Sequence, residues 1–221
     1  TDSGLFAWGV GFSSPAGFSA EYQMNSQFFG SQKYRSLGGI ANAHFSGAAQ
    51  LTENLTLGAG VGVAYSRAEL EGPYTVQSGV LAGAPILMDV HGDDFRPSWN
   101  IGLQYQVSDD TTIGLTYSAE NRFRLKGRGT AIVPTQVGLV GSNYDAQIDL
   151  VWPRSLGLGV AHKINENHRV SVEGIWYDWS SAFDHIDLRL TNGVGTRPPT
   201  VHDTCALRCR DSIAVRTGYE W

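Results

Sequence analysis

The chain has 221 residues, a length that a single all-β domain can reach, and a formal net charge of −5. Charged residues make up 17% of it, below the ~25% of an ordinary soluble domain, and no run approaches the ~20 consecutive apolar residues of a membrane helix, which excludes helical spanning. Because no basic patch stands out that could neutralise phosphates, we expect no nucleic-acid partner.

Alternating apolar and polar residues predict strands along almost the whole chain. The N-terminal TDSGLFAWGVGF is already strand-like and shows no signal-peptide pattern, so we expect a processed or partial chain. We predict eight strands, at residues 5–22, 34–50, 55–71, 97–107, 111–127, 146–164, 168–190 and 211–221.

The predicted connections between these strands alternate strictly in length. Residues 51–55, 108–111 and 165–168 are tight polar turns, whereas 72–96, 128–145 and 191–210 are long segments rich in Gly and Pro. Barrels of the bacterial outer membrane have short periplasmic turns and long extracellular loops. The alternation therefore favours such a barrel over a soluble sandwich, which has no reason to sort its loops by end.

The two faces of the predicted strands differ in polarity. Trp99, Ile101 and Leu103 share one parity, and Asn100 and Gln104 share the other. A solvated outer face would be rich in Lys, Glu, Asp and Arg, but the polar faces here are mainly Gly, Ser, Thr, Asn and Gln. We expect an all-β fold, an antiparallel transmembrane β-barrel with aliphatic residues toward lipid and small polar residues toward an aqueous lumen. A secreted β-sandwich binding module is the alternative, because it too can contain Gly-rich alternating strands.

The stretch GDDFRPSWNIGLQYQVSDDTTIGLTYSAENRFRLKG (92–127) resembles the FadL family of outer-membrane long-chain fatty acid transporters. The resemblance lies in its GDD, its WN-x-G-x-x-Y strand, its polar turn, its LTY-x-x-E and its closing KG. Four other stretches match in the same order: SSPAGFSAEY (13–22), LTENLTLGAGVGVAYSRAELE (51–71), WPRSLGLGVAHKINENHRVSVEGIWYDWSSAF (152–183) and RDSIAVRTGYEW (210–221).

The resemblance implies a fourteen-stranded barrel that is plugged by an N-terminal hatch. Residues 1–221 would form part of one barrel domain, corresponding to strands three to ten, with the hatch and the remaining strands absent. It further implies passive uptake of a long-chain fatty acid or a similar hydrophobic molecule by a protein of the Gram-negative outer membrane, in contact with membrane lipid and lipopolysaccharide. An aromatic hydrocarbon is the alternative substrate.

The resemblance also implies where the molecule binds and leaves. A kink at Ser14, Pro15, Ala16 and Gly17 would open the wall sideways, since Pro15 has no N–H for the ladder and Gly17 tolerates unusual torsions. An ordinary bulge is the other interpretation of this segment. The matched ligand-binding positions are Ser14, Gly17, Leu70 and Val90. Some relatives carry a basic residue just beyond the leucine, where this chain has Gly72, so carboxylate specificity is in doubt.

Cations on the predicted strand 111–127 give a further possibility. Its inward parity would carry Glu120, Arg122, Arg124 and Lys126 into the lumen. Most such charges are expected to be structural pairs. The sharper hypothesis is that Arg122 or Arg124 binds a carboxylate head group.

The remaining side chains with reactive or aromatic chemistry have structural interpretations. His202, Cys205 and Cys209 are too few for a convincing metal site, and a Cys205–Cys209 disulfide is favoured in an oxidising compartment. Five aromatic residues near predicted strand ends or in mid-strand are interpreted as interfacial girdle and packing: Trp99, Trp152, Trp176, Tyr177 and Trp179. No catalytic motif stands out, so we expect neither an enzyme nor a cofactor.

Overall fold

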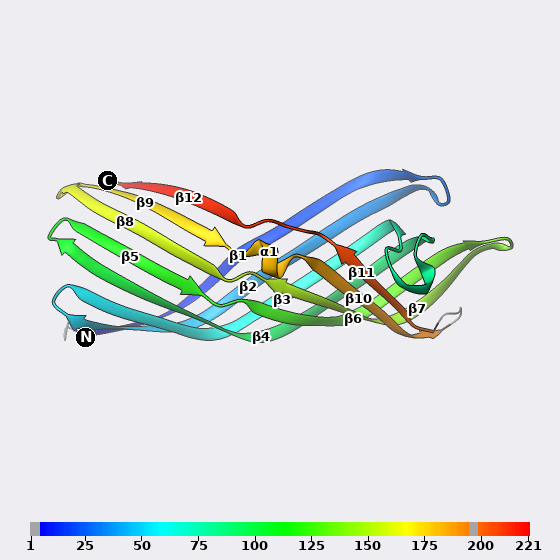
Figure 1. Cartoon of the computed structure of the whole chain (residues 1–221), viewed down its shortest axis with the longest axis horizontal. Helices are drawn as coiled ribbons and strands as arrows, with labels where there is room; N and C mark the ends of the chain where they lie inside the picture. Colours follow the sequence, from blue (N-terminus) through cyan, green and yellow to red (C-terminus); the bar gives the residue numbers. More distant parts are fainter. Residues whose placement is uncertain (1–4, 195–198) are drawn as a thin grey trace.

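The structure is a computed structural model that describes residues 5–194 and 199–221. One antiparallel sheet of twelve strands dominates it (Figure 1). The strands are β1 (Phe6–Ser26), β2 (Gly30–Thr52), β3 (Leu55–Thr75), β4 (Pro85–Ser108), β5 (Thr111–Ser118), β6 (Asn121–Thr135), β7 (Gly138–Trp152), β8 (Ser155–Asn165), β9 (His168–Tyr177), β10 (His185–Val194), β11 (Val201–Ala206) and β12 (Ser212–Glu220). Two short helices, η1 (Gly79–Leu81) and α1 (Trp179–Ala182), interrupt them, and within the described ranges no helix is long and apolar enough to cross a membrane.

Beyond β4 the sheet divides into two branches, which we call the first and the second tier. Along one edge of β4, β5 pairs with residues 100–108 and β6 pairs with residues 87–93. The first tier continues through β8, β9 and β12, and the second through β7, β10 and β11. We call the first tier, with the adjoining parts of β1–β4, the short-turn half, because its strands end in two-residue turns; the rest is the long-hairpin half. They lie at the left and right of Figure 1.

The structure confirms the short turns and corrects the long loops. Turns at 53–54, 109–110 and 166–167 join full strands, as predicted. The predicted loops at 72–96 and 128–145 are instead mostly strand. Residues 191–194 and 201–206 of the predicted loop 191–210 are strand as well, and residues 195–198 lie outside the described residues. Gly129, inside the predicted loop 128–145, is instead a strand position paired with Tyr144, and a Cβ there would lie 2.9 Å from the Leu190 side chain. Close packing within the strands, not a turn, explains this glycine.

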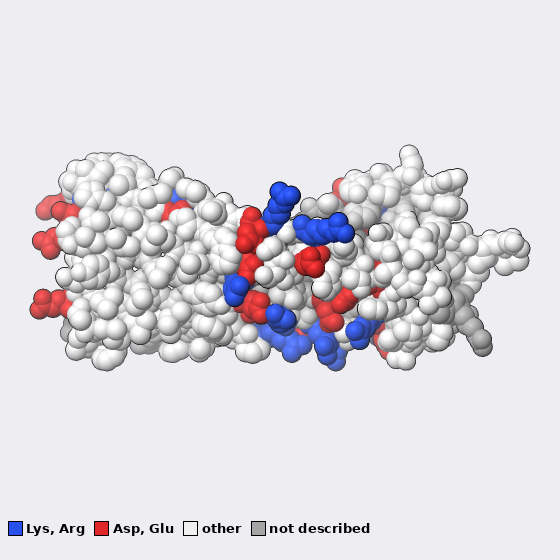
Figure 2. Space-filling view, viewed as in Figure 1, with Lys and Arg blue, Asp and Glu red and all other residues white. Residues whose placement is uncertain are grey.

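The outer face of the short-turn half is apolar, as the alternation predicts. Trp99, Ile101 and Leu103 are exposed on it, while Gly102 and Gln104 line a cavity on the opposite face. Its strands β5, β8, β9 and β12 have 8, 11, 10 and 9 residues, close to the ~9–11 residues of a membrane-crossing strand. Figure 2 shows few charged side chains over this half except at its tip. The half has the dimensions and polarity of a barrel wall in lipid.

The long-hairpin half has the opposite polarity. Its inward residues form the apolar core of the molecule, in which Met88, Leu125 and Leu190 are almost completely buried. Its outer face carries charged residues, and Figure 2 shows them gathered over the middle of the molecule and beyond. Apolar inside and charged outside is the arrangement expected for a part that meets water.

Three predicted strands reverse their faces where the structure breaks them. Leu115 on β5 faces outward and Leu125 on β6 faces inward, although both have the same parity in the sequence. The β4–β5 ladder ends at the pair Asn100–Ser118, and the β4–β6 ladder begins at the pair Asp93–Lys126. Between these two pairs the β5–β6 side has one more residue than β4, which reverses the faces. Comparable breaks divide the predicted strands 146–164 and 168–190.

Candidate functional site

Two cavities lie end to end inside the curved sheet. The first, which we call the lumen cavity, has a volume of about 1040 Å³ and lies mainly in the short-turn half. The second, which we call the apolar cavity, has a volume of about 430 Å³ and lies in the long-hairpin half. Trp179 lines both. The two cavities therefore adjoin at Trp179 and differ in chemical character.

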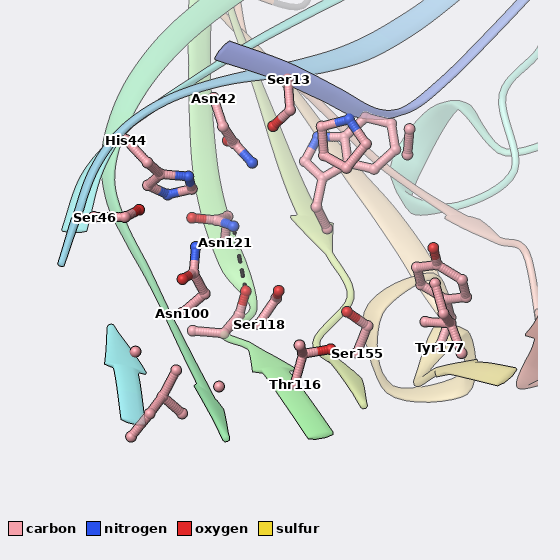
Figure 3. A pocket seen from close by; sticks show the side chains of 18 of the residues that line it. Ser13, Asn42, His44, Ser46, Asn100, Thr116, Ser118, Asn121, Ser155 and Tyr177 are labelled. Carbon is pink, nitrogen blue, oxygen red and sulfur yellow. Dashed lines mark hydrogen bonds between the residues drawn. The ribbon is translucent and has the colours of Figure 1, made fainter. Parts of the chain in front are cut away.

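Small polar side chains from separate strands converge in the lumen cavity (Figure 3). His44 Nε2 lies 2.7 Å from Ser98 Oγ, which joins β2 to β4 across the cavity wall. Asn121 Nδ2 donates to the Ala119 carbonyl at 3.3 Å, at the break between β5 and β6. The polar labelled residues are Ser13, Asn42, His44, Ser46, Asn100, Thr116, Ser118, Asn121, Ser155 and Tyr177. Such a lining is wettable, as the sequence predicts for an aqueous lumen.

The apolar cavity brings together two residues that the resemblance implied as ligand-binding positions. Leu70 on β3 and Val90 on β4 are direct cross-strand partners, and both line the cavity. Met88 lies on the same face of β4. The lining also includes Ile148, Leu150, Phe183, Ile186 and Leu188. A space of this size, walled mainly by aliphatic and aromatic groups, suits a small hydrophobic molecule.

The predicted kink coincides with a register shift in the β1–β2 ladder. Ser13 pairs with Asn42 but Ala16 pairs with Ile40, so two residues of β1 oppose one of β2. The Ser14 hydroxyl donates to the Ile40 carbonyl at 2.9 Å. This is a β-bulge, in which the extra residues bend the strand and leave the ladder locally incomplete.

The bulge changes what β1 presents to the interior. Phe12, before it, is exposed on the outer face, whereas Phe18, after it, lines the apolar cavity. The Phe18 ring lies over Gly38, where a Cβ would collide with it. Ser14, Pro15 and Ala16 line the lumen cavity, and Gly17 lines neither cavity.

Aromatic rings separate the two cavities. Trp152 has ring neighbours Phe18, Trp179 and Phe183 at centroid distances of 6.4, 6.3 and 5.7 Å. Trp152 is 3% exposed, and its indole N–H donates to Ser66 Oγ at 2.9 Å. Of the interpretation as interfacial girdle and packing, the packing part is therefore right for Trp152 and Trp179 and the girdle part is wrong. The alternating apolar residues Ile148, Leu150 and Trp152 were a signal that Trp152 is buried. Because the strand breaks at Pro153, the sequence did not show whether this apolar face points inward or outward.

Arg122 and Arg124 do not point into the lumen. The inward residues of β6 are Asn121, Phe123 and Leu125, and both arginines lie on the exposed face between them. The inward orientation predicted for them was wrong because the extra residue before β6 reverses its faces. Arg122 pairs with Glu120 at 2.8 Å and Arg124 with Asp149 at 3.3 Å, on a surface pocket apart from both cavities.

The predicted disulfide is not formed in the structure. Cys205 and Cys209 are both free thiols. Cys205 belongs to β11 and pairs with Ile186, whereas Cys209 follows the strand and its N–H bonds the Phe183 carbonyl. The extended strand at Cys205 directs the two residues to different neighbours. Within the described ranges, no cluster of His, Cys, Asp or Glu could hold a metal ion.

A buried carboxylate fastens the connection between β3 and β4 to β11. Asp203 accepts hydrogen bonds from the Tyr74 hydroxyl at 2.7 Å, from the Gln77 N–H at 3.0 Å and from the Ser78 N–H at 2.7 Å. Burial opposes ionisation of Asp203, but these donors outweigh it and lower its pKa. Burial and the bond to Asp203 raise the pKa of Tyr74. We call these contacts of Asp203 the Asp203 latch. The sequence does not reveal it, because Asp203 and Ser78 lie about 125 residues apart.

Comparisons with known proteins agree with this architecture. A family model described as "Outer membrane protein transport protein (OMPP1/FadL/TodX)" matches residues 4–220. The chain is 26% identical over 206 residues to outer membrane protein P1 of Haemophilus influenzae, covering 79% of this chain and 43% of that protein. It is 25% identical over 143 residues to the long-chain fatty acid transport protein of Escherichia coli O6:H1, covering 55% of this chain and 31% of that protein.

A solved structure shows the same fold. The toluene transporter TbuX of Ralstonia pickettii superposes with a TM-score of 0.83 at 23% identity, over 99% of this chain and 62% of that one. The chain spans less than half the length of the two curated relatives above. The matches, together with the lipid-type outer face of the short-turn half, identify a transmembrane β-barrel wall of the outer membrane. The chain belongs to the outer membrane transport protein family described as OMPP1/FadL/TodX.

Proposed function

We propose that the protein takes up hydrophobic small molecules passively, by way of its two internal cavities. The carrying observation is that an apolar cavity of about 430 Å³ adjoins a lumen cavity of about 1040 Å³ inside one wall. Binding sites for small molecules typically have volumes of ~300–1,000 Å³ and apolar linings. A molecule captured among the outer hairpins binds between Leu70 and Val90 and then moves into the lumen. Concentration alone drives the movement, and no step is catalytic.

We place the exit at the β-bulge of β1. Ser14, Pro15 and Ala16 both interrupt the β1–β2 ladder and line the lumen cavity. A wall in lipid needs every backbone polar group satisfied, and Pro15 has no N–H to satisfy. Sideways release into the bilayer at this point exposes fewer unpaired groups than at a regular part of the ladder.

Two substrate classes fit the site, and one observation favours aromatic hydrocarbons over fatty acids. Among the described residues that line the apolar cavity there is no Lys, Arg or His to bind a carboxylate. Gly72, which stands where some relatives carry a basic residue, has φ +133°, and a Cβ there would lie 3.0 Å from the Lys33 carbonyl. A long cationic side chain at position 72 would therefore be strained. The long-chain fatty acid remains the alternative substrate.

Ligand binding to purified full-length protein in detergent tests the proposal. We expect toluene and a fluorescent fatty acid to bind, and Leu70→Arg to weaken toluene binding at least about tenfold, because it places a charge in an apolar site. Leu139→Arg is the matched control, since Leu139 is exposed at the end of the β6–β7 hairpin. Equal toluene affinity in both variants and the wild type would place the binding site elsewhere.

Growth of a host with and without the gene separates the two substrate classes. We expect the gene to speed growth on alkylbenzenes at limiting concentration more than growth on oleate, because the cavity has no described cationic lining residue. Faster growth on oleate alone would assign the protein to fatty acids.

We also propose that the charged outer face of the long-hairpin half contacts lipopolysaccharide. Arg122, Arg124, Lys126 and Arg128 alternate along the exposed face of β6, next to the apolar face of the short-turn half. Cations at that level are suited to the phosphates of the outer leaflet. Copurification of lipopolysaccharide should fall when the four are replaced by Gln.

A further inference from the structure

We propose that Trp179 sets the width of molecule that can pass from the apolar cavity to the lumen cavity. The inference rests on the proposed uptake function and adds a specificity-determining residue to it. Trp179 is the one side chain that lines both cavities among the described residues. A molecule that moves between the cavities must therefore pass its indole ring.

The surroundings of Trp179 show that its ring forms part of a partition. Its centroid lies 5.1 Å from that of Phe183 and 6.3 Å from that of Trp152, both in edge-on contact, and 6.3 Å from that of Tyr177. The Phe18 ring also packs against Trp152, with a centroid distance of 6.4 Å. Aromatic rings at these distances attract one another and fill space efficiently. The passage is consequently narrow as long as the rings keep this arrangement.

Trp152 and Trp179 differ in how firmly they are held. Trp152 is a ladder residue of β7, paired with Asn121, and its indole is hydrogen-bonded to the fully buried Ser66. Trp179 lies outside the ladder, in the four-residue helix α1 between β9 and β10, and is only partly buried. Trp152 is thus a fixed wall, and Trp179 is the partner whose side chain can move aside.

The backbone beneath Trp179 is nevertheless anchored. Asp178, which precedes it, pairs with Arg154 at 2.7 Å and accepts the Ser181 N–H at 3.4 Å. Asp211, which precedes β12, accepts the Ser180 N–H at 3.0 Å. These carboxylates hold α1 at the break in the sheet, so that rotation of one side chain, rather than unfolding of the helix, opens the passage. Side-chain rotation of this kind needs little rearrangement when the passing molecule is narrow.

Uptake of two aromatic probes that differ in width tests the inference. Cells with the full-length protein would take up radiolabelled toluene, which is narrow, or pyrene, which is wide. Trp179→Leu keeps an apolar side chain but removes the ring, so we expect pyrene uptake to rise about tenfold and toluene uptake to change less than about twofold. Because Trp179 also lines the apolar cavity, the affinities of the purified variant for toluene and pyrene are measured as well, and the uptake rates are compared at equal occupancy, so that a change in binding is separated from a change in passage.

Controls keep the outcome decisive. Trp99→Leu removes an indole that is exposed on the lipid face and lines neither cavity, and it should leave both rates unchanged. Trp179→Phe, which keeps a ring, should give a smaller rise and carries the test if Trp179→Leu does not assemble. An unchanged pyrene-to-toluene ratio in an assembled variant that still binds toluene would overturn the gate and leave the proposed function standing. Failure of the wild type to bind or take up either probe would overturn both.

Discussion

The two halves of this wall share the same strand alternation but turn their apolar faces in opposite directions. In the short-turn half, Leu103 faces outward and Gln104 inward; in the long-hairpin half, Leu125 faces inward and Arg124 outward. Lipid surrounds the first half and water the second, so the apolar face must change sides along the barrel axis. The polarity of a strand face therefore reports which solvent that part of the molecule meets, not which side is the interior.

The chain achieves this change in two different ways. Along β4 the apolar residues move from even to odd positions. Met88 and Val90, on even positions, face inward, whereas Trp99 and Ile101, on odd positions, face outward. Along β5–β6 the apolar residues stay on odd positions, and the backbone instead exchanges its inward and outward faces at Ala119–Glu120. The cavities and the aromatic partition lie at the level where these changes occur.

A charge on the lipid face should break the comparison most strongly. We expect Leu103→Arg to cost about 4 kcal/mol of the free energy of unfolding, since an arginine near the middle of the bilayer is poorly solvated. Urea unfolding of the protein refolded into lipid vesicles measures it. Leu139→Arg in the long-hairpin half is the control and should cost less than about 0.5 kcal/mol, as an exposed surface change does. Similar costs for the two would mean that Leu103 does not face lipid.

Truncation of a leucine in each half sharpens the difference between core and wall. Leu125 is 0% exposed, so Leu125→Ala should cost about 3 kcal/mol through lost burial and a residual cavity. Leu103, which is 41% exposed, should lose less than about 1 kcal/mol on the same change, because lipid fills the space. The two variants are compared in the same vesicle assay. An equal loss at both positions would contradict the assignment of the apolar core to the long-hairpin half.

The Asp203 latch should give the long-hairpin half its own acid sensitivity. Asp203→Asn removes the charge that Tyr74, Gln77 and Ser78 stabilise, and we expect a loss of about 2 kcal/mol. The pKa of Asp203 is lowered from 3.8, so its contribution is fully present above that value and lost as the pH falls through the folded-state pKa. Hydrogen exchange at residues 76–84, measured from pH 6 to pH 2, should show the loss in the wild type. A pH profile that Asp203→Asn leaves unaltered would assign it to another group.

The smallest effect is expected at the exposed ion pairs of the outer face. Arg124→Ala should cost less than about 1 kcal/mol, because Arg124 and Asp149 are both partly in water. Added salt should reduce even that difference, which thermal unfolding at 0.05 and 0.5 M salt would show. A larger, salt-independent loss would indicate that Arg124 supports the wall by packing.

Sequence reasoning predicted the hairpins and the polarity of the short-turn half because turn residues and strict alternation are local signals. It failed where one additional backbone residue decides which face of a strand points inward. Nothing in the alternation through residues 111–127 marks the reversal, so Arg122 and Arg124 were assigned to the wrong face. The long-hairpin strands were missed because glycines that close packing requires, such as Gly129, also have the composition of a loop.

The candidate site was predictable only in part, and for a similar reason. The resemblance pointed to Leu70 and Val90, which the structure brings together as cross-strand partners in one cavity. Trp152, Trp179 and Phe183 were not recognised as cavity residues, since their meeting depends on the short helix that interrupts β9 and β10. A hydrophobic cluster assembled across a strand break leaves no periodic trace in the sequence.

The same strand carries Phe12 toward the acyl chains and Phe18 toward the ligand space, with Pro15 between them. On the exit route proposed above, a solute would meet the Phe18 ring, then the Pro15 ring and then the Phe12 ring. Apolar side chains would follow one another along a single strand, so the apolar surface of the solute would face water over a shorter distance than along the polar lining of the lumen cavity alone.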